Sequence, residues 1–70
     1  MEDNSLKELE ALIRYLVDHN VHHTEELEEL AESLKKNGKD EAYTEVLSAI
    51  ESYREGNKKL SSALDKFLEK

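Results

Sequence analysis

Apolar residues recur every three or four positions along most of the chain, without any stretch of strict alternation. This period is typical of amphipathic α-helices and disfavours β-strands. The pattern is interrupted at Asn37-Gly38, where glycine suits the left-handed residue that ends many helices. We therefore predict an all-α chain, an antiparallel hairpin of two long helices at about residues 5–37 and 40–69.

Both predicted helices have residues that suit their ends. Ser5 followed three residues later by Glu8 has the spacing of a capping box, in which each side chain accepts a backbone N–H. Lys35 and Lys36 suit the negative end of the helix dipole. Asp40 is a favourable N-cap for the second helix.

One apolar seam can be followed along each helix, with alternating spacings of three and four residues as in left-handed helix pairs. In the first helix the seam consists of Leu9, Ile13, Leu16, Asn20, His23, Leu27, Leu30 and Leu34. In the second helix it consists of Val46, Ile50, Tyr53, Asn57, Leu60, Leu64 and Phe67. Each seam is interrupted once by polar residues, and each interruption includes an asparagine.

Folding the chain at the predicted turn places the two interruptions opposite each other. Asn20 then faces Gly56 or Asn57, and His23 faces Tyr53, so the two interruptions form one polar layer in an otherwise apolar seam. A buried asparagine in such a seam fixes register and oligomeric state at some cost in stability. We predict that role for Asn20 and Asn57.

The apolar stripe on each helix is wider than one seam requires. The flanking residues are Leu12, Val17 and Val21 on the first helix and Ala42, Leu47 and Leu68 on the second. A lone hairpin would expose them, so we predict a homodimer that forms a four-helix bundle. The alternative is a three-helix bundle with a break near residues 18–24, which are rich in poor helix formers. A further break at Gly56 is also considered.

Composition narrows the class of protein. The 70 residues predict a single domain, 1–70, with 39% charged residues and a net charge of −7. This acidity disfavours nucleic acids and anionic membranes as partners, and no apolar run approaches the ~20 residues that span a bilayer. There is no cysteine, which excludes disulfides and thiolate metal sites and is compatible with a cytoplasmic location. We expect a soluble cytoplasmic protein.

All three histidines, His19, His22 and His23, lie within five residues. On a helix, His19 and His23 share one face, and two imidazoles at this spacing can bind one divalent metal ion. His22 or Glu26, each within one turn of the pair, can assist as a further ligand. Nickel, cobalt and zinc all accept imidazole, so the ligands do not select among them.

The same histidines have other interpretations. Exposed histidines on acidic helices usually bind nothing, and His23 on the core side can instead donate a hydrogen bond to Asn57 or to the hydroxyl of Tyr53. Two histidines on one helix form a weak site, which a dimer would strengthen with a second set. If His23 is buried and neutral, its protonation below about pH 6.5 is expected to open the polar layer.

The run His19-Asn20-x-x-His23 precedes a glutamate-rich stretch, a short turn and a second helix with Asn57 at its middle. In this it resembles a group of short acidic helical proteins, some of which are labelled as nickel or cobalt transport associated. The resemblance implies metal binding at His19 and His23, and a structural or supporting role for Asn20 and Asn57. It assigns no role to His22.

Several enzyme classes are disfavoured. The chain has no Glu-x-x-His pair of the di-iron carboxylate type, no glycine-rich phosphate loop and no cysteine nucleophile. We therefore predict a non-enzymatic protein. One hypothesis is a metal carrier, or an accessory to a transport or maturation partner. The other is a structural or adaptor module that binds a protein partner through its apolar helical face, without a ligand.

Overall fold

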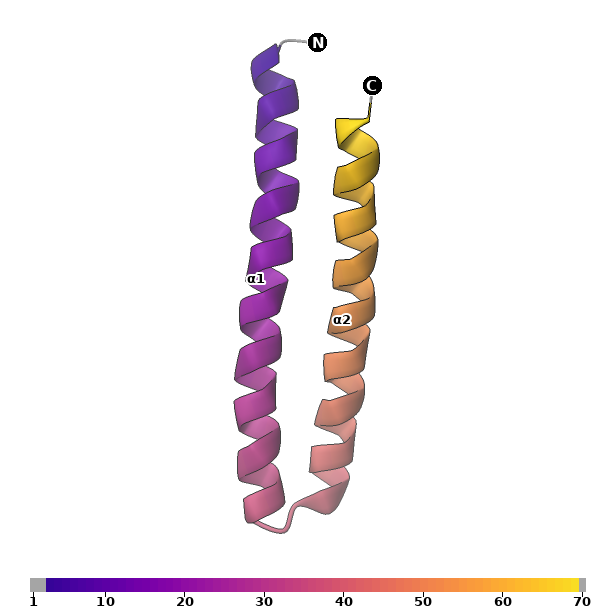
Figure 1. The fold of residues 1–70 in the computed structure, drawn as a ribbon. Coiled ribbons are helices and arrows are strands. Elements are labelled where there is room, and N and C mark those ends of the chain that lie inside the picture. Colours follow the sequence, from indigo (N-terminus) through magenta and orange to yellow (C-terminus); the bar gives the residue numbers. More distant parts are fainter. Residues whose placement is uncertain (1–2, 70) are drawn as a thin grey trace.

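The computed structural model describes residues 3–69, with side chains from residue 5 onward. The chain forms two α-helices, α1 (Asp3–Lys36) and α2 (Asp40–Leu68). They run antiparallel, so that the described ends of the chain lie at the same end of the molecule (Figure 1). The molecule is a rod with principal extents of 53 × 16 × 12 Å. The predicted helical hairpin is confirmed.

Both helices pass without interruption through the positions where a break was considered. In α1, the Thr24 hydroxyl donates a hydrogen bond of 2.8 Å to the backbone carbonyl of Asn20. The hydroxyl is thereby satisfied within α1, and Thr24 does not cap the start of a separate helix. In α2, Gly56 has an ordinary negative φ and the helix continues to Leu68. The three-helix alternative is therefore wrong for this chain.

The helix starts differ slightly from the predicted ones. α1 begins at Asp3, so Ser5 lies inside the first turn and is not the N-cap. The N-cap of α2 is Lys39, which makes no side-chain capping bond. Asp40 and Glu41 lie in the first turn of α2 instead, where their negative charge suits the positive end of the helix dipole.

The turn between the helices is a Schellman motif. The backbone N–H of Lys39 donates to the carbonyl of Leu34 at 2.9 Å, and the N–H of Gly38 donates to that of Lys35 at 3.1 Å. Gly38 has a φ of 71°, the left-handed conformation that glycine adopts without a Cβ clash. The predicted role of Gly38 is confirmed.

The helices pack most tightly next to this turn. Of the described side chains, only Ala31 and Ile50 are buried, at 4% and 3% exposed. Leu30, which was predicted in the seam, is 46% exposed, and Ala31 takes its place against α2. The small alanine lets the helices approach closely, and Leu27 and Leu34 of the predicted seam stay partly buried on either side of it.

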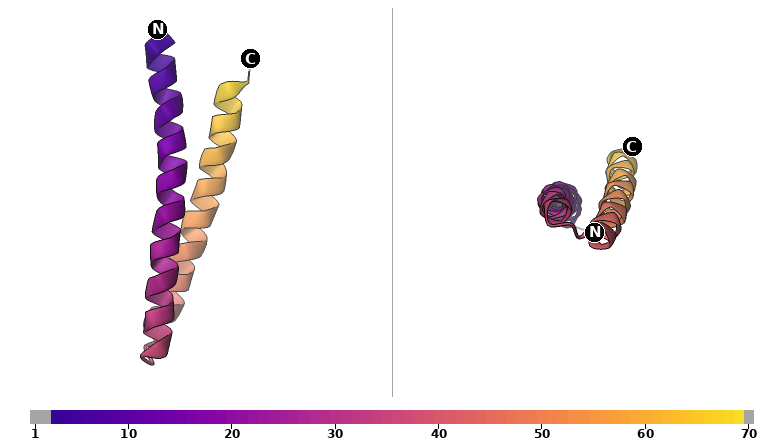
Figure 2. Two further views of the ribbon diagram at one scale, coloured as in Figure 1. Left: turned by 60° about the vertical axis from the view of Figure 1, so that its left-hand side comes forward. Right: turned by 90° about the horizontal axis from the view of Figure 1, so that it is seen from below.

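Toward the open end the helices diverge, as the left view of Figure 2 shows. The seam is therefore covered less well there: Leu9 is 43% exposed, although it was predicted in the core. The residues expected to flank the seam are also exposed, among them Leu12, Leu47 and Leu68. Among the described side chains, nine large hydrophobic ones are exposed, whereas two hydrophobic ones are buried.

Candidate functional site

A polar layer crosses the middle of the hairpin, as the pairing of the two seams predicts. The side-chain amide of Asn20 donates a hydrogen bond of 3.2 Å to the amide oxygen of Asn57 on the other helix. Both side chains are partly buried. The bond satisfies one polar group on each helix inside an apolar seam, and it favours the single register in which the two amides meet.

This pairing predicts an asymmetry between single and double substitutions. Asn20→Leu or Asn57→Leu alone should lower the free energy of unfolding by about 1–2 kcal/mol, because the remaining amide loses its partner. The double variant removes both polar groups and should be at least as stable as the wild type. Urea denaturation at one fixed protein concentration measures the free energy of unfolding of all three variants. A double variant whose loss of stability equals the sum of the two single losses would contradict the pairing.

Beside the polar layer, two imidazoles of α1 converge. The Nε2 atoms of His19 and His23 lie 2.8 Å apart, a hydrogen-bond distance at which one ring donates and the other accepts. The ring centroids are 4.3 Å apart and the ring planes are nearly perpendicular, at 89°. The structure therefore brings together the two histidines that the spacing predicted, with the same nitrogen of each ring directed at the other.

Neighbouring side chains orient these two rings. Tyr15 stacks on His19 with centroids 5.4 Å apart, and Tyr53 of α2 stacks on His23 with centroids 6.0 Å apart. A carboxylate oxygen of Glu26 lies 3.3 Å from Nδ1 of His23. A carboxylate at Nδ1 favours the tautomer in which the proton sits on Nδ1, leaving the lone pair of His23 Nε2 directed at His19.

The spacing of the two nitrogens suits a shared metal ion. Two nitrogen ligands about 2.0–2.1 Å from one ion, at angles between a right angle and the tetrahedral angle, are about 2.8–3.4 Å apart. The observed 2.8 Å lies at the short end of this range, and the two rings must turn so that both Nε2 lone pairs meet at one ion and not at each other. Among the described side chains, no three from His, Cys, Asp or Glu are grouped to hold a metal ion, so the converging pair consists of two imidazoles without a third such side chain.

The other predicted ligands lie apart from this point. His22 is 79% exposed, and its Nδ1 is 3.6 Å from Glu25 on the outer side of α1. Glu26 approaches the Nδ1 side of His23 and not the Nε2 pair, so its position is that of a supporting residue. His23 is 42% exposed and not buried, so the premise of the pH-switch expectation is not met. Its hydrogen-bonding partner is His19, whereas Asn57 pairs with Asn20.

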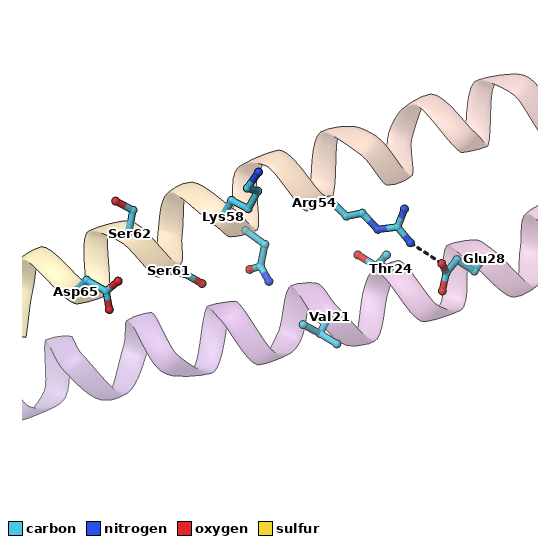
Figure 3. Close-up of a pocket in the computed structure, with 9 residues that line it drawn as sticks. Val21, Thr24, Glu28, Arg54, Lys58, Ser61, Ser62 and Asp65 are labelled. Carbon is cyan, nitrogen blue, oxygen red and sulfur yellow. Dashed lines mark hydrogen bonds and ion pairs between the residues drawn. The ribbon is translucent and has the colours of Figure 1, made fainter.

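Two features of the site were not anticipated from the sequence. Tyr15 was not among the residues predicted for this site, although its spacing of four residues before His19 is the spacing at which helical side chains meet. On the opposite side of the hairpin, Arg54 donates a hydrogen bond of 2.6 Å to Glu28 across an open groove of about 690 Å³ (Figure 3). This ion pair also joins the two helices, but it lies on the far side from the histidines.

The comparison with protein families gives one result. A family described as "Domain of unknown function (DUF8180)" matches residues 9–67. The chain belongs to this family. The match includes most of both helices, the paired histidines and the polar layer, and the family's description names no reaction or ligand. Neither the curated proteins nor the solved structures gave a match.

Over residues 3–69, neither helix has an apolar stretch that would carry it across a lipid bilayer.

Proposed function

We propose that this protein binds a divalent transition metal ion, nickel, cobalt or zinc, through the Nε2 atoms of His19 and His23. The observation that carries the proposal is the 2.8 Å approach of these two nitrogens on an accessible side of α1. Both rings are already oriented by Tyr15, Tyr53 and Glu26, so metal binding requires little further ordering of side chains.

Metal binding also changes the protonation of the pair in a defined way. In the metal-free pair, one Nε2 carries the hydrogen of the Nε2···Nε2 bond. Coordination needs a lone pair on both Nε2 atoms, so that hydrogen moves to Nδ1 of the same ring through exchange with water. The rings stay neutral, and binding weakens at acidic pH because protons compete for the same nitrogens.

The proposed activity is that of a carrier or an accessory protein in the cytoplasm, and not of an enzyme. The pair lies on an accessible side of a thin rod and contributes two ligands per chain, an arrangement that favours exchange of the ion with a partner. A catalytic metal is normally held by three protein ligands in a site that excludes bulk water.

Calorimetric titration of metal-free protein with Ni²⁺, Co²⁺ and Zn²⁺ tests the proposal. At about pH 7.5 we expect saturable binding, tighter than millimolar, of at least one of these ions, and a marked loss of affinity at about pH 5.5. Mg²⁺ serves as the control ion, because it prefers oxygen ligands and should not bind to the pair. Binding of all three transition metals no tighter than millimolar would refute the proposal.

The second candidate is a structural or adaptor module without a ligand. It is favoured by the exposed apolar side chains, such as Leu12 and Leu30, which suit docking of another helix. In that case the paired histidines only hold each other in place. The same titration separates the two functions, because an adaptor of this kind would show no saturable metal binding.

A further inference from the structure

One side of α1 has a palindromic pattern centred between the two histidines. Leu12 lies seven residues before His19, and Leu30 lies seven residues after His23. Seven residues are close to two helical turns, so the four side chains lie along one side of the helix. Both leucines are left exposed, at 52% and 46%. An antiparallel copy of α1 would therefore place leucine against leucine and histidine against histidine.

The adjoining side of α2 alternates large and small residues. Large residues repeat every seven positions at Val46, Tyr53, Leu60 and Phe67, and small ones at Ala42, Ala49, Gly56 and Ala63. Tyr53 stacks on His23, and it lines one hollow with Gly56, Leu60 and Asn20, so this side of α2 adjoins the histidines. When two such helices pair antiparallel, each large residue faces a small one, which is the condition for close interdigitation.

Gly56 has no evident role within a single chain. Its φ is not positive, and a Cβ added there would meet no atom within 4 Å beyond the neighbouring backbone of its own helix. Glycine in a helix interior is less favourable than alanine, so the isolated hairpin would be more stable without it. Close approach of another backbone is a common reason for such a glycine.

The exposed area also indicates a missing partner. The chain exposes 5677 Å², whereas a compact monomer of its mass, 8.1 kDa, exposes about 4,500 Å². The excess is about 1,200 Å² per chain, so covering it in a pair would bury about 2,400 Å² in total. That area lies in the range of obligate homodimers.

We propose that a second copy of this chain docks on the histidine face, defined as Leu12, His19, His23 and Leu30 of α1 with Tyr53, Gly56 and Leu60 of α2. A twofold axis perpendicular to the helices, at the level of the paired histidines, relates the copies. The two histidine pairs then bind one metal ion between them. This inference rests on the proposed metal-binding function. It identifies a second copy of the chain as the partner, and the histidine pair of that copy as the remaining ligands.

The twofold axis accounts for the separate observations together. Leu12 contacts the partner's Leu30, and Tyr53 packs over the partner's Gly56. The centre of the histidine pair lies within about two residues, or about 3 Å, of the middle of α1, so the two copies overlap along almost their whole length. Four imidazoles around one ion complete the tetrahedral set that zinc prefers.

Light scattering and zinc calorimetry on the full chain test this inference. With zinc we expect a dimer that binds one ion per two chains, and a dimer dissociation constant at least about tenfold lower than in EDTA, because metal binding and dimerisation are coupled. Gly56→Leu should give a monomer with at least about tenfold weaker zinc binding. Ser62→Leu is the matched control, because it adds the same side chain to the same helix on the opposite groove.

A second variant, Leu12→Ser, probes the interface from α1 and should also shift the protein toward monomer. Circular dichroism of both interface variants verifies that they keep their helices. A monomer that binds one zinc ion per chain would overturn the shared site but leave the proposed metal-binding function intact. A dimer that binds none of Ni²⁺, Co²⁺ and Zn²⁺ would overturn both. A zinc-linked dimer that persists in Gly56→Leu and Leu12→Ser would refute the histidine face as the interface.

Discussion

Replacement of Ile50 by alanine is expected to lower the free energy of unfolding by about 3 kcal/mol. Ile50 is 3% exposed and, with Ala31, is one of the two buried side chains among those described. A hairpin with so small a core has little stability in reserve. We therefore expect the variant to lose most of its helical circular dichroism before any urea is added.

Leu47→Ala is the matched control for this prediction. Leu47 lies on the same helix, three residues from Ile50, but is 41% exposed, so its truncation removes far less buried surface. Its expected cost is about 1 kcal/mol or less. Equal urea midpoints for the two variants, compared at the same protein concentration, would show that the seam does not run through Ile50.

The second large effect is expected at the paired histidines. His19→Ala and His23→Ala should each weaken transition-metal binding by at least about 100-fold, more than the 10- to 100-fold typical of supporting residues around a metal. Each variant removes one of the two nitrogens that lie 2.8 Å apart. Calorimetric titration with the best-bound ion gives the affinities, and circular dichroism confirms that the variants keep the helical hairpin.

Two further variants separate direct ligation from general charge effects. His22→Ala should change the affinity by less than about twofold, because His22 lies on the outer side of α1 next to Glu25. Glu26→Gln should weaken binding by about tenfold, because the residue contacts Nδ1 of His23 and only supports the ligand. A loss of affinity in His22→Ala equal to that in His19→Ala would contradict the assignment of the metal to His19 and His23.

The sequence predicted the helical hairpin because the turn residues and the spacing of the two seams both agree with the observed pairing of the helices. Gly38 ends α1 in the left-handed conformation, and the asparagines of the two seams meet at the position that this turn dictates. Turn chemistry and seam spacing are properties of neighbouring residues along the chain, so they can be derived before any tertiary structure is known.

The details that the sequence did not predict depend on how closely the helices approach. Spacing alone does not distinguish Leu30 from Ala31 as the residue that faces α2, and the tight contact beside the turn selects the smaller one. In the same way, spacing selected His19 and His23 as the pair but did not decide whether His22 or Glu26 assists them. Only the side-chain positions show that His22 lies beside Glu25 and that Glu26 lies at Nδ1 of His23.

The central claim is that the Nε2 atoms of His19 and His23 bind one metal ion. Nitrogen-detected NMR of the histidine rings, recorded as zinc is added to labelled protein, observes these atoms directly. We predict that Nε2 of His19 and His23 shifts to the position of a metal-bound nitrogen at stoichiometric zinc, while both nitrogens of His22 keep their metal-free positions. Ring signals of all three histidines that stay unchanged, or that shift together only in a large excess of zinc, would contradict the claim.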